Sequence, residues 1–504
     1  MKKAVYNVMI ITIVAKLLGF GRELLLSYFF GANGLSDAYL ISQTIPGTIF
    51  QFVGTGLATA FIPVYMKVKS AEGNEKANRF SNTILTTILM FSTIAIVIVC
   101  VYTEQIVKLF ANGFEGDTLH YAVIFTRIGI FSLYFSAMIY IFNSYLQSNG
   151  EFSIVAFVAI PNSIIIMLAI VAGAKMDIMA LPIGSVFAVF VQVIILLPAM
   201  KRQGYRFGMN FELGNFYVKE MIHLMIPVII GVSVNQINVL VDRTIASQIA
   251  VGGISALIYA DSLIMFVQGI FSQSIATVYY PQITQLAEEH KENELKKMLN
   301  EALESMAFML IPIMLGCIVL GTGIVRALYG RGAFDEEAIR LTGTALSFYG
   351  FGIVGYGFRE ILSRVFYAYH DTKTPMINSM IGMLLNIILN LTLSRTFGIG
   401  GLALATSMSS IVTAILLYVH LKKKIGIIFV KAEKIEIFKM LACAVIMGAE
   451  TWIAYSMVNQ YIGAFSAIVI SIVSGIIVYF VLAKICRIKM FMQGFKFVKK
   501  VTGK

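Results

Sequence analysis

Long hydrophobic segments, separated by short polar connections, follow one another through the whole 504-residue chain. Each comes close to the about 20 residues that a helix needs to cross the hydrocarbon core of a bilayer. The predicted spans are 4–30, 38–65, 80–103, 118–147, 152–174, 178–200, 218–248, 254–283, 299–327, 337–369, 374–398, 400–421, 437–458 and 462–485. The pattern therefore predicts an all-α polytopic membrane protein with about fourteen transmembrane helices.

The first span carries charges where an apolar segment should have none. Lys16, Arg22 and Glu23 lie well inside the run, and each charge at bilayer depth costs at least about 2.5–3.5 kcal/mol. An internal salt bridge is one interpretation, but Glu23 can neutralise only one of the two cations. We therefore favour a helix that faces a polar, anion-binding cavity.

Composition and charge placement agree with a membrane protein: the chain is 58% hydrophobic and 13% charged, with a net charge of +12. Lys and Arg concentrate in alternate connections and at both ends, and the positive-inside rule then predicts that both termini are cytoplasmic. The basic charge thus reflects topology and does not indicate nucleic-acid binding. The four cysteines are isolated and no enzyme motif occurs, so we predict no disulfide framework, no cofactor and no enzyme.

Short segments recur at an interval of about 220 residues, as expected for an internal repeat. The matching pairs are 61–63 with 279–281, 143–150 with 365–372, and 180–185 with 402–407. We predict an N-lobe of six spans at 1–216, a C-lobe of six spans at 217–430, and two extra spans with a basic tail at 431–504. Parallel repeats of this kind are typical of alternating-access transporters with a central cavity.

Polar residues also occur inside three later spans. Asp242 and Arg243 lie in 218–248, Asn386 and Asn390 are one helical turn apart in 374–398, and Thr406 lies in 400–421. The carboxylate, amide and hydroxyl oxygens of the Asp, Asn and Thr residues suit a small hard cation such as Na⁺. Hydrogen bonding between helices is the commoner use of Asn and Thr in bundles, and spacing alone favours it.

Span 337–369 contains three charges of its own. Glu360 and Arg364 are spaced to pair with each other on one helix face. Their pairing would leave Arg359 as the cation that could meet a ligand.

Segments 17–46, 61–65 and above all 359–375 (REILSRVFYAYHDTKTP) resemble the MurJ (MviN) family of lipid II flippases in the MOP exporter superfamily. The likeness covers the whole chain. It implies that the protein carries undecaprenyl-diphosphate-linked disaccharide-pentapeptide from the inner to the outer leaflet of the bacterial cell membrane. It further implies contact with membrane lipids and with cell-wall synthesis machinery. The two extra spans could then form a groove for the lipid tail.

The resemblance also assigns residues. Lys16 stands where the family has an arginine, and Arg22, Glu23 and Asp37 align with residues of the substrate cavity. The residues that match the family's sodium site are Asp242, Asn386, Leu402 through its backbone carbonyl, Asn390 and Thr406. These matches shift the balance for that cluster towards a Na⁺ site.

The chain departs from the family pattern at Phe50, Gln51 and Ser262, where Gram-negative members carry arginines. We expect Arg243 or Arg359 to compensate for them. The losses slightly favour a flippase for another polyprenyl-diphosphate-linked oligosaccharide as an alternative. A cation-coupled drug exporter and a non-transporting cell-wall scaffold are weaker alternatives, because neither explains the cations in the first span.

Overall fold

The structure, a computed structural model, describes residues 2–212, 214–426 and 431–493, and these ranges contain helices, turns and connections but no β-strand. Each of the fourteen predicted spans falls on helical structure, so the predicted all-α class is confirmed. Within the described residues, ten helices are long and apolar enough to cross a membrane, or eleven if one bent pair counts as a single span. A total of fourteen stays a prediction.

Part of the difference arises in α2 (Gly34–Val101), a helix of 68 residues that covers two of the predicted spans and counts once. The helix is interrupted at Gly73, whose backbone has a φ of 82° and a ψ of 179°. Only glycine adopts this conformation without steric cost. The helix begins at a capping box in which the Asn33 side chain accepts the Ser36 amide and the Ser36 hydroxyl accepts the Asn33 amide.

The chain forms two compact units, residues 1–255 with 332–334, and 256–331 with 335–504. The further helices of the first unit are α1 (Lys2–Phe30), α3 (Thr103–Phe110), α4 (Gly116–Gly129), α5 (Ser132–Ser148), α6 (Phe152–Phe157), α7 (Ala159–Lys175), α8 (Ala180–Arg202) and α9 (Phe216–Ile249). Its core forms where α2 packs against α4, α5 and α9. The packing boundary thus follows α9, whereas the sequence repeat predicts a boundary after residue 216.

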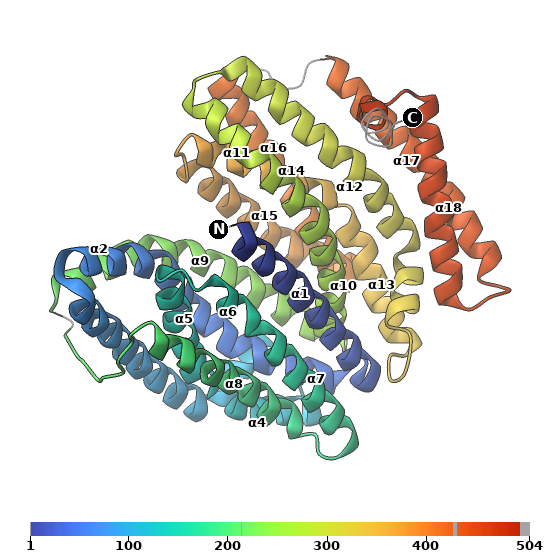
Figure 1. Ribbon diagram of the computed structural model, residues 1–504. Helices are drawn as coiled ribbons and strands as arrows, with labels where there is room; N and C mark the ends of the chain where they lie inside the picture. Colours follow the sequence, from blue (N-terminus) through green and yellow to red (C-terminus); the bar gives the residue numbers. More distant parts are fainter. Residues whose placement is uncertain (1, 213, 427–430, 494–504) are drawn as a thin grey trace. The chain divides into compact units, whose positions relative to one another are not determined.

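The helices of the second unit are α10 (Gly253–Val267), the π-helix η1 (Gln268–Ser272), α11 (Gln273–Glu288), α12 (Glu292–Leu328), α13 (Glu336–Gly350), α14 (Ile353–Ala368), α15 (Lys373–Phe397), α16 (Ile399–Ile425), α17 (Lys431–Val458) and α18 (Ala464–Ile485). The first residues of α10 belong to the first unit. Helix α12 packs against α13, α14 and α17, and α15 packs against α16. Helices α17 and α18 lie side by side along α12 (Figure 1).

Each unit contains the same interrupted helix, which supports the predicted repeat. Helices α4 and α5 are separated at residues 130–131, and α13 and α14 at residues 351–352. Both α5 and α14 end in a left-handed residue, Gly150 (φ 84°) and His370 (φ 57°). In each, the next amide donates to the carbonyl five residues earlier, at 2.9 Å. This geometry pairs Gly150 with His370, a register two residues away from the predicted one.

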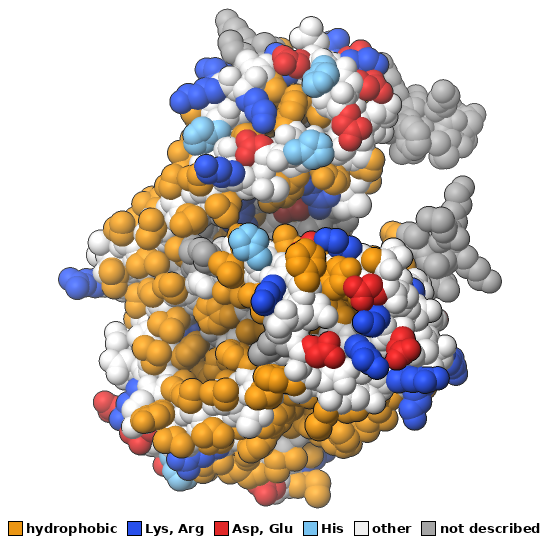
Figure 2. Space-filling view, turned by 90° about the vertical axis from the view of Figure 1, so that its left-hand side faces the viewer, with side chains coloured by type: hydrophobic (Ala, Val, Ile, Leu, Met, Phe, Trp, Pro, Cys, Tyr) orange, Lys and Arg blue, Asp and Glu red, His pale blue; other side chains and the backbone are white. Residues whose placement is uncertain are grey.

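Large hydrophobic side chains remain exposed on many helices, among them Leu168 (64%) on α7, Trp452 (57%) on α17 and Ile477 (58%) on α18. Figure 2 shows hydrophobic side chains over broad areas of the surface. Apolar surface on this scale is typical of helices that face lipid.

Candidate functional site

Arg22 sits on α1 at a point where that helix packs closely against α7. A side-chain carbon at the neighbouring Gly21 would lie 3.1 Å from the terminal methyl group of Met167, so the two helices are in tight contact here. The Arg22 side chain is half-buried and makes no hydrogen bond or ion pair with any described residue. Its guanidinium lies within electrostatic range of the Tyr39 hydroxyl. The group is therefore a cation held in an apolar helix and available to an anionic ligand.

The other two charges of α1 differ from Arg22. Lys16 is exposed and Glu23 is half-buried, and each already interacts with another group of the protein. Both side chains thus have partners within the protein, whereas the structure gives the Arg22 guanidinium no hydrogen bond or ion pair among the described residues. Both Lys16 and Glu23 stay predicted substrate-binding residues.

The Asp37 carboxylate accepts hydrogen bonds from other groups of the protein. Its carboxylate, 1% exposed, accepts the Gly252 amide at 2.9 Å and both the amide and the hydroxyl of Ser255 at 2.7 Å. These donors all lie in the first unit, around the first residues of α10, where unpaired amides and the helix dipole favour a carboxylate. The geometry gives Asp37 a structural role, and binding of substrate by this residue stays a prediction.

The three residues at the positions where other family members have arginines make apolar contacts or neutral hydrogen bonds. Phe50 is buried, and its ring centroid lies 4.9 Å from that of Tyr140. Gln51 accepts a hydrogen bond from the amide of Gln236 on α9. The Ser262 hydroxyl donates to the Ile258 carbonyl of its own helix at 2.9 Å. None of these three positions supplies a positive charge.

Helix α9 carries the charged pair predicted at 242 and 243, and both side chains are half-buried. The Nε of Arg243 is buried without a hydrogen-bond acceptor among the described residues. A buried guanidinium nitrogen without an acceptor is costly, which supports the prediction that an anionic group reaches Arg243. Asp242 already interacts with another group of the protein.

In the second unit, the four predicted Na⁺ ligands form one connected cluster on α15 and α16. The Asn386 amide donates to the Thr406 hydroxyl at 3.1 Å, and the Asn390 amide donates to the Asn386 carbonyl oxygen at 2.8 Å. The Thr406 hydroxyl donates to the Leu402 carbonyl at 3.0 Å. Both asparagines are at most 2% exposed. The cluster offers neutral oxygens that fit Na⁺, and it forms the hydrogen bonds that the competing interpretation predicts. Asp242 belongs to the first unit.

The predicted pairing on α14 is confirmed. The Arg364 guanidinium lies 2.9 Å from Glu360 and stacks 5.5 Å from the centre of the Tyr280 ring on α11. Arg359 has no ion pair within the described residues, and its guanidinium lies 5.5 Å from the Tyr356 ring centre. Arg359 therefore remains the cation of α14 that can bind an anion.

The DTKTP segment, which carries much of the family resemblance, connects α14 to α15. Asp371 accepts the Thr374 amide at 3.0 Å and the Thr374 hydroxyl at 2.8 Å, and the Lys424 ammonium lies 3.7 Å away. The Thr374 amide chiefly holds the pKa of Asp371 below its usual value of 3.8, with help from the Thr374 hydroxyl and Lys424. The segment is thus a helix connection with its own polar network.

Two apolar cavities adjoin α12 and α18 in the second unit. One, of about 410 Å³, is lined by α10, α12, α17 and α18, and the other, of about 580 Å³, by α11, α12 and the segment after α18. They share Phe308, Met309 and Phe480, so the two cavities adjoin each other, and together we call them the groove at α18. This agrees with the predicted groove at the extra helices.

Sequence reasoning missed two polar contacts inside the first unit. The Tyr39 and Ser185 hydroxyls lie 2.7 Å apart, and the Gln192 amide donates to Asn162 at 2.9 Å. The signal was a polar residue in an apolar span, but a lone Tyr, Ser or Gln is too common there to single out.

The fold described above is one that transporters of the MOP superfamily have. An inward-facing multidrug resistance MATE family transporter of that superfamily has the same fold, with a TM-score of 0.70 at 13% identity over 86% of this chain and 99% of that one. The sequence profile of the family "Lipid II flippase MurJ" matches residues 26–499, and the chain belongs to this family. It is accordingly a multi-pass membrane transporter and not an enzyme.

Relatives agree along nearly the full length. The probable lipid II flippase MurJ of Haemophilus influenzae is 28% identical over 89% of this chain and 92% of its own. That of Thermotoga maritima is 25% identical over 95% of both chains. The structure of a lipid II flippase MurJ in an inward closed conformation matches with a TM-score of 0.82 at 26% identity, covering 95% of this chain and 98% of that one.

Proposed function

We propose that this protein flips lipid II, the undecaprenyl-diphosphate-linked peptidoglycan precursor, from the inner to the outer leaflet of a bacterial cell membrane. The observation that carries the proposal is membership of the MurJ family over residues 26–499. The physical need is plain, because a diphosphate cannot cross about 30 Å of hydrocarbon unaided. A protein with cations inside its apolar helices meets that need.

Arg22 is the residue to which we assign the main contact with the diphosphate. It is half-buried, it has no ion pair among the described residues, and its planar guanidinium suits phosphate oxygens. Arg243, with its buried Nε, and Arg359, with only a ring contact, supply the further cations. Lys16, Glu23 and Asp37 complete the set that the family resemblance implies.

The apolar groove at α12, α17 and α18 would hold part of the polyprenyl tail. Its walls are almost entirely hydrophobic, and the residues at its junction, Phe308, Met309 and Phe480, belong to both cavities. Burial of isoprenoid carbon against such walls is favourable in proportion to the area removed from water or headgroups.

A second candidate substrate is another polyprenyl-diphosphate-linked oligosaccharide. The observation in its favour is the neutral environment at Phe50, Gln51 and Ser262, which the structure fills with packing and hydrogen bonds. Fewer cations would suit a head group with less negative charge than a pentapeptide-bearing one.

We further propose that transport proceeds by alternating access and that Na⁺ biases one state through Asn386, Asn390, Thr406 and the Leu402 carbonyl, with Asp242 as the predicted carboxylate ligand. An ion shifts a conformational equilibrium only by its differential affinity for the two states. Transport into vesicles should therefore fall when choline replaces Na⁺, and Asp242→Asn should abolish that dependence. Equal transport in both salts would remove the coupling proposal and leave the flippase proposal intact.

We also propose that both termini are cytoplasmic, with cell-wall synthesis enzymes as partners. The orientation rests on the distribution of Lys and Arg. A cysteine-reactive, membrane-impermeant probe at an added N-terminal cysteine should label inverted vesicles but not intact cells.

Complementation tests the substrate. A bacterium depleted of its own MurJ should grow when it expresses this chain and should not grow with an equally abundant Arg22→Ala variant. If the wild type reaches the membrane and fails to support growth, the other polyprenyl-linked saccharides become the substrates to test. If both versions grow alike, Arg22 does not bind the substrate.

A further inference from the structure

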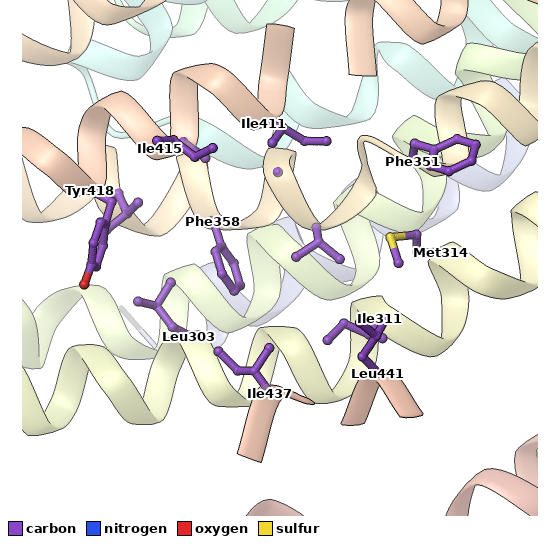
Figure 3. A pocket seen from close by; sticks show the side chains of 14 residues that line it. Leu303, Ile311, Met314, Phe351, Phe358, Ile411, Ile415, Tyr418, Ile437 and Leu441 are labelled. Atoms are coloured by element: carbon purple, nitrogen blue, oxygen red, sulfur yellow. The ribbon is translucent and has the colours of Figure 1, made fainter. Parts of the chain in front are cut away.

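A separate apolar cavity of about 400 Å³ lies in the second unit, between α12, α14, α16 and α17. Figure 3 shows Ile411 and Ile415 on one side of it, Ile437 and Leu441 on the other, and Phe358 between them in this view. The cavity shares no lining residue with the groove at α18. It is therefore a second site, separate from that groove.

The residues that line the cavity extend along the lengths of the surrounding helices. At one end of the cavity, the same helix faces continue in lysine residues. On α16, Lys422 follows Tyr418 and Ile415 by one and two turns on the same helix face. On α17, Lys434 precedes Ile437 and Leu441 in the same way. The end of α16 and the beginning of α17 are the cytoplasmic ends under the proposed topology. The apolar walls thus end in cations at the inner membrane surface.

A third lysine approaches the same end from α12. Lys296 lies two turns before Leu303 on the face that lines the cavity. Its ammonium nitrogen is 3.2 Å from where a Cβ would sit at Gly426, the residue that ends α16. No ion pair joins Lys296, Lys422 or Lys434 to a carboxylate in the described part of the chain, although eleven other pairs form there. Three helices therefore bring unneutralised cations to one mouth.

We infer that this cavity binds an anionic phospholipid of the inner leaflet, with one acyl chain between the four helices and the phosphate at the lysines. An apolar pocket that ends in basic residues at the cytoplasmic surface is the arrangement that recognises such a lipid. A free anion would not need the apolar walls, and a neutral lipid would not need the lysines. The inference does not rest on the proposed transport function.

Photolabelling of the full-length protein tests the site directly. The protein is reconstituted in phosphatidylcholine vesicles with a phosphatidylglycerol that carries a diazirine on one acyl chain, and adducts are mapped by mass spectrometry. We expect adducts within 303–314, 351–362, 411–418 and 437–441. Lys422→Gln with Lys434→Gln should reduce them about 25-fold, because each lysine near an anionic surface contributes about fivefold.

Two control variants distinguish the loss of this site from a general loss of positive charge or of folded protein. Lys423→Gln with Lys484→Gln removes the same charge from α16 and α18 away from the cavity walls, and labelling should stay within about twofold of wild type. Ala414→Leu, which fills part of the cavity, should reduce adducts while the protein still elutes as one species. A photoreactive phosphatidylcholine should label the cavity far less.

Several results would overturn the inference. One is equal labelling by phosphatidylglycerol and phosphatidylcholine, and another is equal loss in the two double variants. Adducts that map only outside the cavity would also reject it. If undecaprenyl diphosphate displaces the label whereas unlabelled phosphatidylglycerol does not, the cavity belongs to the transported lipid, and the phospholipid site is rejected.

Discussion

Arg22 on α1 and Arg364 on α14 are both arginines inside apolar helices, one in each unit, yet their surroundings differ. Arg364 has a carboxylate at 2.9 Å on its own helix and an aromatic ring beneath it. Arg22 has neither among the residues that the structure describes, and its guanidinium lies within electrostatic range of the Tyr39 hydroxyl. The energetic cost of Arg364 is offset inside the protein. We propose that the cost of Arg22 is offset by the anionic substrate, which is why we place function on α1.

The first prediction separates the two arginines by function and stability. Arg22→Gln should reduce growth support about 10- to 150-fold, since a charge-assisted contact with the diphosphate is worth about 1.5–3 kcal/mol. Its melting temperature should hardly change. Arg364→Gln should lower the melting temperature and retain growth. Complementation and thermal unfolding of purified protein measure both quantities.

Arg22→Lys sharpens this contrast. It keeps the charge but loses the planar fork of donors, so growth support should fall between wild type and Arg22→Gln. If Arg22→Gln instead unfolds the protein while Arg364→Gln stops transport in a folded protein, the assignment of roles is reversed.

The second prediction concerns the pair on α14. With the two side chains 21% and 41% exposed, solvent screens the pair in part, and we expect a coupling of about 1 kcal/mol or less. Arg364→Gln and Glu360→Gln should each destabilise the protein, and the double variant should lose less than their sum. Strict additivity would show that the contact contributes nothing and that Arg364 is as available as Arg22.

These two helices also show what the sequence can predict. The i, i+4 spacing of Glu360 and Arg364 predicts their pair because the geometry of one helix is fixed. The apolar runs predict the helices for the same reason, since the chain must satisfy its backbone locally in a membrane. The state of Arg22 depends on which side chains of α2 and α7 come near it, and spacing within α1 cannot supply that.

Asp37 marks the limit of prediction for the site. Alignment with a cavity residue suggests a ligand contact, whereas its oxygens receive donors from residues 252 and 255, more than two hundred positions away. Only tertiary structure brings those amides to it. The DTKTP segment shows a related limit. Its sequence identifies the family, but in the structure it forms a connection between helices, in which the Asp371 carboxylate accepts a hydrogen bond from the Thr374 amide.

The third prediction concerns the C-terminal end of α14, the helix that carries Arg364, and the contribution of that end to the stability of the fold. His370 ends α14 with a φ of 57°, where a side chain costs about 1 kcal/mol relative to glycine. His370→Gly should therefore stabilise the protein by about 0.5 kcal/mol, after allowing for the greater freedom of glycine in the unfolded chain. Thermal unfolding measures this.

The first unit supplies the matched control. Gly150 ends α5 with the same hydrogen-bond pattern and has open space around it, so Gly150→His isolates the backbone cost. It should destabilise the protein by about 1 kcal/mol. If both substitutions act in the same direction, backbone strain does not govern these two helix ends.

The smallest expected effect is a pH dependence at the connection after α14. Because the fold lowers the pKa of Asp371 below 3.8, the ionised carboxylate favours the folded state. Its contribution is fully present above the unfolded pKa and is lost as the pH falls through the still lower folded pKa. Asp371→Asn should thus be less stable than wild type at pH 6, and the difference should shrink below about pH 4. A difference that stays constant down to pH 2.5 would mean that the contacts with Thr374 and Lys424 do not depend on the charge, and that the polar network holding α14 to α15 works as hydrogen bonds alone.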